Sequence, residues 1–180
     1  MAPKPYLCVV DLEATCWQEG EKRWPDKEII EIGALLVARE GLAPLREFES
    51  LVRPVRSPAL SEFCTRLTTI TQAEVDSAPL FPEALARFAR WLPLPGECLF
   101  ASWGAYDKAQ LEQDCRQHGV GYPFDEEHLN LKRHFGGKKG CAPCGMKEAL
   151  HKLGLPLEGS HHRALPDVRN IVRVLQAVGL

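Results

Sequence analysis

The chain lacks a long hydrophobic run and any leader-like amino terminus. No stretch of about 18 apolar residues, the length that a membrane helix needs, occurs among its 180 residues. The first expected strand begins within a few residues of Met1, which leaves no room for a charged-then-apolar export signal. These absences predict an unexported protein that does not enter a membrane.

The chain also lacks an excess of basic charge. Lys and Arg number 22 against 24 Asp and Glu, which gives a formal charge of −2. Non-specific binding to duplex nucleic acid depends on clustered cations that displace counterions from phosphates, and no large basic face is implied. The densest basic stretch, 131–139 (LKRHFGGKK), could hold a phosphate backbone, but a solvated loop is the favoured interpretation.

A disulfide framework is not indicated either. The seven cysteines are an odd number, and several lie within apolar runs. This pattern fits reduced thiols in a cytosol better than paired ones, so we predict a cytoplasmic protein. Cys141 and Cys144 have the spacing of half a zinc site or of a redox pair. Because no second Cys or His pair stands at ribbon or finger spacing, neither function is favoured.

The length suits a single domain, which we assign to residues 1–180. Apolar, β-branched patterns predict a buried strand within 6–17, then strands over 28–37 and 47–52, and another over 98–104. A charged loop is expected over 18–27. The three successive strands suggest an antiparallel meander.

Helical signals fill most of the remaining sequence. Thr71 and Glu74 form a capping-box pattern, and apolar residues recur at helical spacing from Phe81 to Leu92. Further helices are expected over 108–118, 146–153 and around 168–175, whereas 119–145 reads as irregular apart from a short segment at 129–135. Together, these strands and helices predict an α/β domain. Its mixed sheet combines an antiparallel meander with parallel strands and is flanked by helices.

Two carboxylates stand at the end of the first strand. The apolar run within 6–17 (YLCVVDLEATCW) leads to Asp11 and Glu13, which one leucine separates. Side chains alternate across a strand, so both acids point to the same face with Cα atoms about 6.6 Å apart. The pair could share a divalent cation, which would offset their repulsion and lost hydration. A strand end in solvent explains the pair equally well.

Three more residues become informative together with this pair. Asp107 lies at a strand-to-helix junction and on its own is better explained as a helix N-cap. Asp167 begins the terminal helix just before its apolar stripe, and His162 lies one short turn upstream. Four carboxylates from three distant segments, plus one histidine, can hold two Mg²⁺ or Mn²⁺ ions, because these hard cations take oxygen ligands.

This set resembles the DEDDh 3′→5′ exonucleases of the ribonuclease H-like superfamily. Asp11-Leu12-Glu13 is similar to their first motif, Asp107 to the second, and His162 with four residues before Asp167 to the third. Over nearly the whole chain the resemblance narrows to the Eri-type ribonucleases, which trim structured RNA 3′ ends. It rests on 11–17 (DLEATCW), 28–33 (EIIEIG), 60–68 (LSEFCTRLT), 102–104 (SWG) and 145–146 (GM). Pro166 replaces the aspartate that often precedes the last ligand.

The resemblance implies a ribonuclease H-like exonuclease fold and a two-metal mechanism, with Mg²⁺ as cofactor and Mn²⁺ as a substitute. Asp11, Glu13 and Asp167 would hold the ion that activates a water. Asp11 and Asp107 would hold a second ion, about 3.5–4 Å away, that stabilises the leaving 3′ oxygen. His162 and Glu13 would be the catalytic residues. Of the two, His162 would be the general base that takes a proton from the water.

The neighbouring His161 is interpreted as solvent-facing or structural. The resemblance also implies a set of contacts to the terminal nucleotide: Glu13, Ala14, Thr15, Phe63, Leu67, Thr68, Trp103 and His162. The predicted substrate is a nucleic-acid 3′ end, as single-stranded RNA or a short 3′ overhang, hydrolysed to 5′-mononucleotides. Two alternatives stay open: a DNA-directed 3′→5′ exonuclease of the proofreading or repair type, and a protein that binds RNA ends without cutting.

Overall fold

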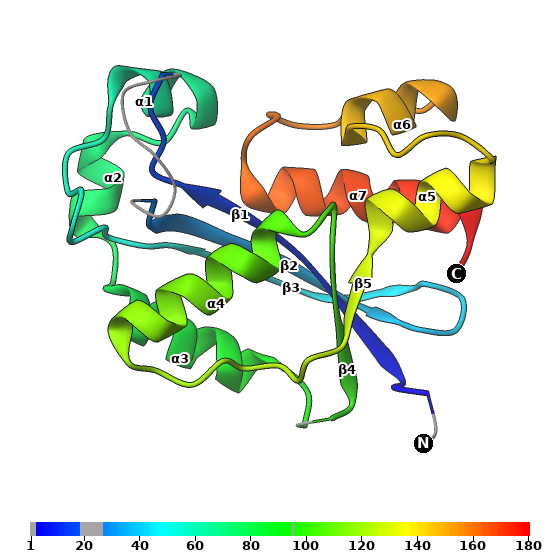
Figure 1. Ribbon diagram of the computed structural model, residues 1–180, viewed down its shortest axis with the longest axis horizontal. Coiled ribbons are helices and arrows are strands. Elements are labelled where there is room, and N and C mark those ends of the chain that lie inside the picture. The colour runs from blue at the N-terminus through cyan, green and yellow to red at the C-terminus, as the bar shows by residue number, and fades with distance from the viewer. Residues whose placement is uncertain (1–2, 19–26, 95) are drawn as a thin grey trace.

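Strand pairing places the first strand of the sequence at the centre of a five-stranded sheet (Figure 1). The strands are β1 (Tyr6–Ala14), β2 (Ile29–Ala38), β3 (Pro44–Leu51), β4 (Cys98–Ser102) and β5 (His128–Asn130), in the spatial order β3-β2-β1-β4-β5. β2 runs antiparallel to both β1 and β3, whereas β4 runs parallel to β1, and β5 to β4. The predicted mixed sheet, a meander extended by parallel strands, is confirmed.

The computed structural model describes residues 3–18, 27–94 and 96–180. Most of the loop expected over 18–27 therefore lies outside the described residues. Within them, no helix combines the length and the apolar character that crossing a membrane requires.

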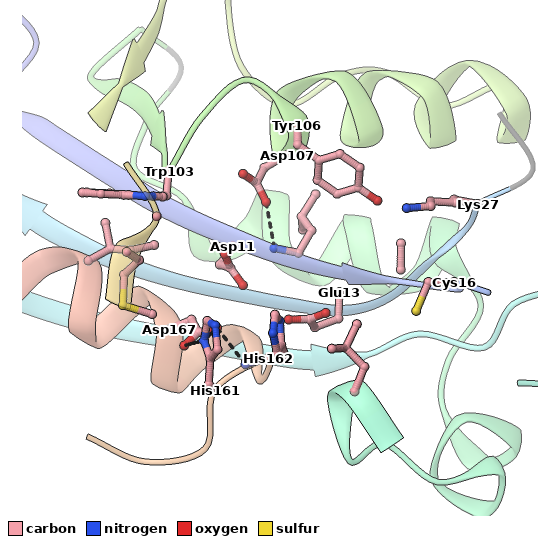
Figure 2. A pocket seen from close by; sticks show the side chains of 16 residues that line it. Asp11, Glu13, Cys16, Lys27, Trp103, Tyr106, Asp107, His161, His162 and Asp167 are labelled. Carbon is pink, nitrogen blue, oxygen red and sulfur yellow. Dashed lines mark hydrogen bonds and ion pairs between the residues drawn. The ribbon is translucent and has the colours of Figure 1, made fainter. Parts of the chain in front are cut away.

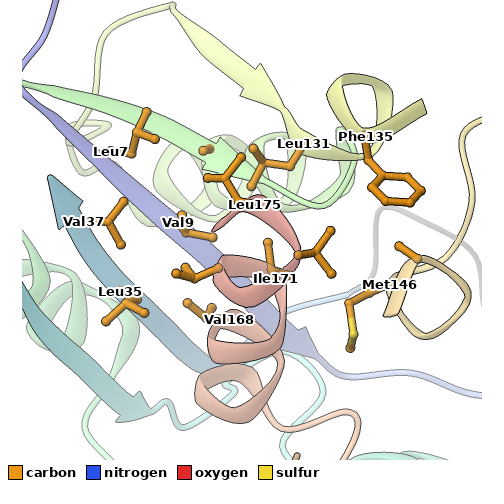
Figure 3. Close-up of a cluster of buried hydrophobic side chains, with 14 of the residues drawn as sticks. Leu7, Val9, Leu35, Val37, Leu131, Phe135, Met146, Val168, Ile171 and Leu175 are labelled. Atoms are coloured by element: carbon orange, nitrogen blue, oxygen red, sulfur yellow. The ribbon is translucent and has the colours of Figure 1, made fainter. Parts of the chain in front are cut away.

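Helices cover both faces of the sheet. One face carries α3 (Phe81–Trp91) and α4 (Tyr106–His118), and the other carries α5 (Leu131–Lys139), α6 (Met146–Lys152) and α7 (Ala164–Val178) (Figure 1). Alternate side chains of β1 enter the two cores, as a period of two requires: Leu7 and Val9 pack towards α7 (Figure 3), and Val10 and Leu12 towards α3 and α4. Asp11 and Glu13 continue the first of these rows and so face α7.

Two short helices stand beyond the ends of β1 and β2. These are α1 (Glu62–Thr68) and α2 (Gln72–Ser77), and α2 begins with the predicted capping box, in which the Thr71 side chain and Glu74 exchange hydrogen bonds with each other's backbone. A small third core cluster joins them to the sheet through Cys16, Ile30 and Cys64, among other residues. The cluster fixes one wall of the space at the end of β1.

Two interpretations of local structure are wrong. The segment 131–139 is not a solvated loop but helix α5, which begins at an Asn130 side-chain cap, and Phe135 anchors it in the core. The irregular stretch expected between 119 and 145 is confirmed outside 128–139, where the ordered segment expected at 129–135 extends to β5 and the whole of α5. Asp107 is not a helix N-cap: Ala105 holds that position without a side-chain bond, and Asp107 lies within the first turn of α4.

Candidate active site

A cleft of about 390 Å³ opens at the carboxyl end of β1, between the first turns of α4 and α7 (Figure 2). All four predicted carboxylates line it. Asp11 and Glu13 come from β1, Asp107 from α4 and Asp167 from α7. The fold therefore brings together residues that lie up to about 150 positions apart in the sequence, from opposite faces of the sheet.

Three of the carboxylates converge. Asp11, Glu13 and Asp167 each offer an oxygen, and these oxygens all lie within 4.8 Å of one another. Asp107 approaches from the other side of β1, where its Oδ1 accepts a hydrogen bond from the Leu12 backbone N–H at 3.1 Å. This bond to the central strand fixes the Asp107 carboxylate beside Asp11, as Figure 2 shows.

The convergent acids are poorly solvated. Burial raises the pKa of Glu13 to about 8, and the nearby charges of Glu31 and Asp167 add to the effect. Burial also raises the pKa of Asp107 to about 6, and together with the charge of Asp107 it holds the pKa of Asp11 well above its usual range. Such a set of hard oxygen donors with uncompensated negative charge suits divalent cations such as Mg²⁺ or Mn²⁺.

The two adjacent histidines both approach Asp167. His162 has a left-handed backbone (φ 63°), which is unusual for a residue with a side chain, and its N–H donates to Asp167 Oδ2 at 2.9 Å. The His161 Nδ1 lies 2.9 Å from the same oxygen, and the two imidazole centroids are 3.9 Å apart. The solvent-facing interpretation of His161 is therefore wrong: its ring points into the cleft.

Strand β2 fixes the turn that carries these histidines. The fully buried carboxylate of Glu31 accepts hydrogen bonds from Arg163 Nε at 3.0 Å and from the Ala164 N–H at 2.8 Å. Two residues along the strand, Gly33 lies so close to α7 that an added Cβ would stand 2.4 Å from the Ala164 carbonyl carbon. Residues 31 and 33 of the EIIEIG segment thus position the start of α7, between His162 and Asp167.

The predicted nucleotide contacts divide into two groups. Ala14, Leu67, Trp103 and His162 line the cleft, as does Glu13. Among the described residues, Thr15, Phe63 and Thr68 do not line it. The Thr15 hydroxyl accepts from the Glu28 N–H at 3.0 Å, the Thr68 hydroxyl donates to the Cys64 carbonyl, and Phe63 packs on the third core cluster.

Among the cleft residues that the sequence did not identify as site residues, Tyr106 and Lys27 carry polar groups. Tyr106 is 40% exposed, and the Lys27 ammonium lies 5.4 Å from the centroid of its ring (Figure 2). Both line the cleft, where they add an aromatic face and a cation to an otherwise acidic wall. A tyrosine immediately before Asp107 was the available signal, whereas Lys27 gave none, because its carbonyl is held by side chains from distant segments, Gln110 and Gln113 of α4 and Arg56.

Acidic residues gathered around the end of the central strand of a mixed sheet are the kind of ligand set that metal-dependent phosphodiester hydrolases use. A family model described as "Exonuclease" matches residues 8–175. The chain therefore belongs to this exonuclease family, and the DEDDh, Eri-type recognition made from the sequence is confirmed.

The curated relatives include "3'-5' exonuclease Snipper" of Drosophila melanogaster, 31% identical over 191 residues, which cover 95% of this chain and 68% of that protein. They also include the human "3'-5' exoribonuclease 1", 32% identical over 178 residues, with 94% of this chain covered and 51% of that protein. The chain thus spans about half of the human relative.

The solved structures that resemble this chain include nucleases of the same kind as the relatives found by sequence. The nuclease domain of 3'hExo, described as a DEDDh family member bound to rAMP, superposes with a TM-score of 0.88 at 30% identity, over 96% of this chain and 90% of that one. A structure titled "3'-end specific recognition of histone mRNA stem-loop by 3'-exonuclease" gives 0.87 at 30% identity, over 96% and 63%. The predicted fold is confirmed, and the family depends on divalent metals.

Proposed function

We propose that this chain is a 3′→5′ exonuclease that hydrolyses RNA 3′ ends to 5′-mononucleotides, with residues 1–180 as one catalytic domain. The observation that carries the proposal is the convergence of Asp11, Glu13 and Asp167 within 4.8 Å beside a histidine. Relatives named exoribonucleases, and structural neighbours with rAMP and a histone mRNA stem-loop in their titles, favour RNA. The seven free thiols favour a reducing compartment such as the cytoplasm.

The ligand assignments follow the geometry of the donors. Asp11, Glu13 and Asp167 would hold one Mg²⁺, and Asp11 with Asp107 a second, with Mn²⁺ as a substitute. Bound there, the ions would supply an activated water and charge stabilisation for the leaving 3′ oxygen. The raised pKa of Glu13, about 8, makes this carboxyl dependent on a cation for full ionisation at neutral pH.

His162 is the proposed general base. Burial lowers the pKa of its imidazole, and the neighbouring His161 lowers it further, so the ring is neutral near pH 7 and able to accept the proton of the attacking water. Its backbone bond to Asp167 keeps it next to the metal ligands. Ala14, Leu67, Trp103 and Tyr106 would contact the terminal nucleotide.

The test is turnover of matched, uniformly labelled RNA and DNA oligonucleotides, single-stranded or with a 3′ overhang. Mg²⁺ or Mn²⁺ should support release of 5′-mononucleotides, and EDTA should abolish it. Faster cleavage of DNA than of RNA would favour the DNA-directed exonuclease instead. Binding of RNA without turnover in either metal would favour a protein that binds RNA ends without cutting them. Cleavage of a circular RNA would contradict an exonuclease.

A further inference from the structure

Basic charge is unevenly distributed along this chain. The segment 130–157 contains six Lys or Arg residues and one acidic residue, Glu148, although the whole chain carries 22 basic and 24 acidic residues. The six lie on or beside α5 and α6: Lys132, Arg133, Lys138, Lys139, Lys147 and Lys152. We call the side of α5 and α6 that carries these six residues the α5–α6 surface; on it, Lys152 pairs with Glu148 at 2.8 Å and Lys138 donates to the Leu180 carbonyl at 2.7 Å.

This surface adjoins the cleft. Gly145 and Met146, at the start of α6, line the cleft wall, and the next residue, Lys147, is exposed. Lys147 therefore brings a cation of the basic segment to the edge of the cleft.

Helix α5 is joined to the same wall. The ring of Phe135 in α5 lies 6.0 Å from the ring of Trp103, measured between centroids. The Cys144 carbonyl accepts a hydrogen bond from Trp103 Nε1 at 3.1 Å, and Trp103 lines the cleft. The basic residues of α5 thus continue outward from the wall that α6 begins.

Helices α1 and α2, on the other side of the cleft, carry more acidic than basic side chains, although Lys27 also lines the cleft. Leu67 brings α1 to the cleft, and α1 and α2 carry Glu62, Glu74 and Asp76 against the single cation Arg66. A polyanion that leaves the cleft over α1 and α2 would meet like charge, and one that leaves over α6 and α5 would meet opposite charge. Complementarity of this kind directs a charged partner to one side.

We propose that the α5–α6 surface binds the phosphate backbone of the substrate upstream of its 3′-terminal nucleotide. The inference rests on the proposed function, because it assumes that the 3′ end occupies the cleft. Helix α5, at about 1.5 Å per residue, is long enough for a few successive phosphates of a single strand. Exposed cations along it would add affinity for long substrates without touching the reacting phosphate.

The experiment compares two doubly neutralised variants on two substrates. Arg133→Gln with Lys139→Gln removes two exposed cations from α5, and Arg90→Gln with Arg116→Gln removes two exposed cations from α3 and α4, on the other face of the sheet. Each is assayed on a 12-nucleotide RNA and on the dinucleotide with the same 3′ end. Both variants change the net charge equally, so the control accounts for long-range electrostatics.

The α5 variant should raise KM for the 12-mer about 3- to 10-fold, leave kcat within about twofold and leave the dinucleotide unaffected. Loss of two phosphate contacts should also lower the slope of log KM against log salt by about 1.4. The control should do none of this. Equal effects of the two variants, no effect of the α5 variant, or an equal loss on the dinucleotide would each overturn the proposal.

Binding separates this proposal from the proposed function. Fluorescence anisotropy of the labelled 12-mer in an Asp107→Asn background measures affinity without turnover. If the α5 variant binds the 12-mer more weakly and the α3–α4 control variant does not, the result supports RNA binding at the α5–α6 surface, even if the parent chain hydrolyses neither RNA nor DNA. If the α5 variant binds as tightly as the parent and the parent is active, the α5–α6 proposal is wrong and the proposed hydrolase activity stands.

Discussion

Asp107 and Asp114 lie two turns apart on α4, and each accepts a backbone N–H from a strand. Asp107 accepts from Leu12 at 3.1 Å, and Asp114 accepts from Ile29 at 2.7 Å. Both are buried, but only Asp107 lines the cleft. The two residues therefore allow a ligand role to be separated from a structural one.

Asp107→Asn should lower kcat by about 10²-fold or more while the protein stays folded, because the change removes a metal-ligand charge and no core volume. Asp114→Asn, the matched control, should lower the melting temperature and leave kcat within about threefold. The measurement is single-turnover hydrolysis of labelled RNA alongside a thermal melt. Normal cleavage by Asp107→Asn would reduce this residue to a structural acceptor.

His162→Ala should lower the rate about 10²- to 10⁴-fold, the range for a positioned general base. Protonation inactivates a base, and the pKa of His162 is lowered, so the acidic limb of the wild-type pH–rate profile should have its midpoint below about 6.5. The variant should lose this limb. A pH–rate profile with saturating Mg²⁺ measures both effects.

His161→Ala is the control for the base. Its ring contacts Asp167, so a loss of up to about tenfold is expected, with the acidic limb retained. If His161→Ala alone removed the limb, the proton acceptor would be His161, and the spacing of four residues before Asp167 would have identified the wrong histidine.

Two glutamates tie the sheet to α7 through arginines, and they differ in burial. Glu31 of β2 is fully buried and binds Arg163 and the Ala164 N–H. Glu47 of β3 is 39% exposed and binds Arg169, which is 51% exposed. At the scale of whole elements, the first pair holds the start of α7 against β2, and the second lies on the surface of the same helix.

Glu31→Gln should cost about 3 kcal/mol of stability, since it leaves one partner of a buried charge pair uncompensated, and should lower kcat about 10- to 100-fold with KM little changed. Glu47→Gln should cost less than about 1 kcal/mol, as exposed pairs usually do, and leave kcat unchanged. Denaturant melts and steady-state kinetics measure the two effects. Equal kcat values for both variants would show that the start of α7 does not depend on Glu31.

The acidic cleft affects the stability of the whole molecule. In the folded protein the pKa of Glu13 is about 8, above its ordinary value of 4.5, and burial is the main cause. The folded state then binds more protons than the unfolded state between these two values, so the free energy of unfolding falls as pH rises through that window. Divalent cations that bind only the folded state oppose the loss.

In EDTA the melting temperature should therefore fall between about pH 5 and pH 8, and Mg²⁺ should raise it more at pH 8 than at pH 5. The Glu13→Gln variant should flatten the dependence in EDTA. Thermal melts at the two pH values, with and without Mg²⁺, measure it. A melting temperature that rises with pH in EDTA would contradict the raised pKa of the Glu13 carboxyl.

Local patterns in the sequence determined four of the five strands, all except β5, together with the capping box and the shared face of Asp11 and Glu13, because side-chain alternation and helix caps depend on neighbouring residues alone. The motif spacing also identified the family. Whether residues 1–180 form one independent domain stays a prediction.

Only the tertiary structure decided the features that depend on distant partners. Asp107, which taken alone resembles a helix cap and together with the other acids a metal ligand, lies in the cleft because its carboxylate accepts from the N–H of Leu12 in β1. The segment 131–139 becomes a helix because Phe135 finds the α7 side of the core. Thr15 and Thr68 bond to backbone within the protein, and His161 turns inward because Asp167 lies within reach. Sequence periodicity reports which face of an element is apolar, whereas hydrogen bonds between segments far apart in the chain form only once the elements have packed.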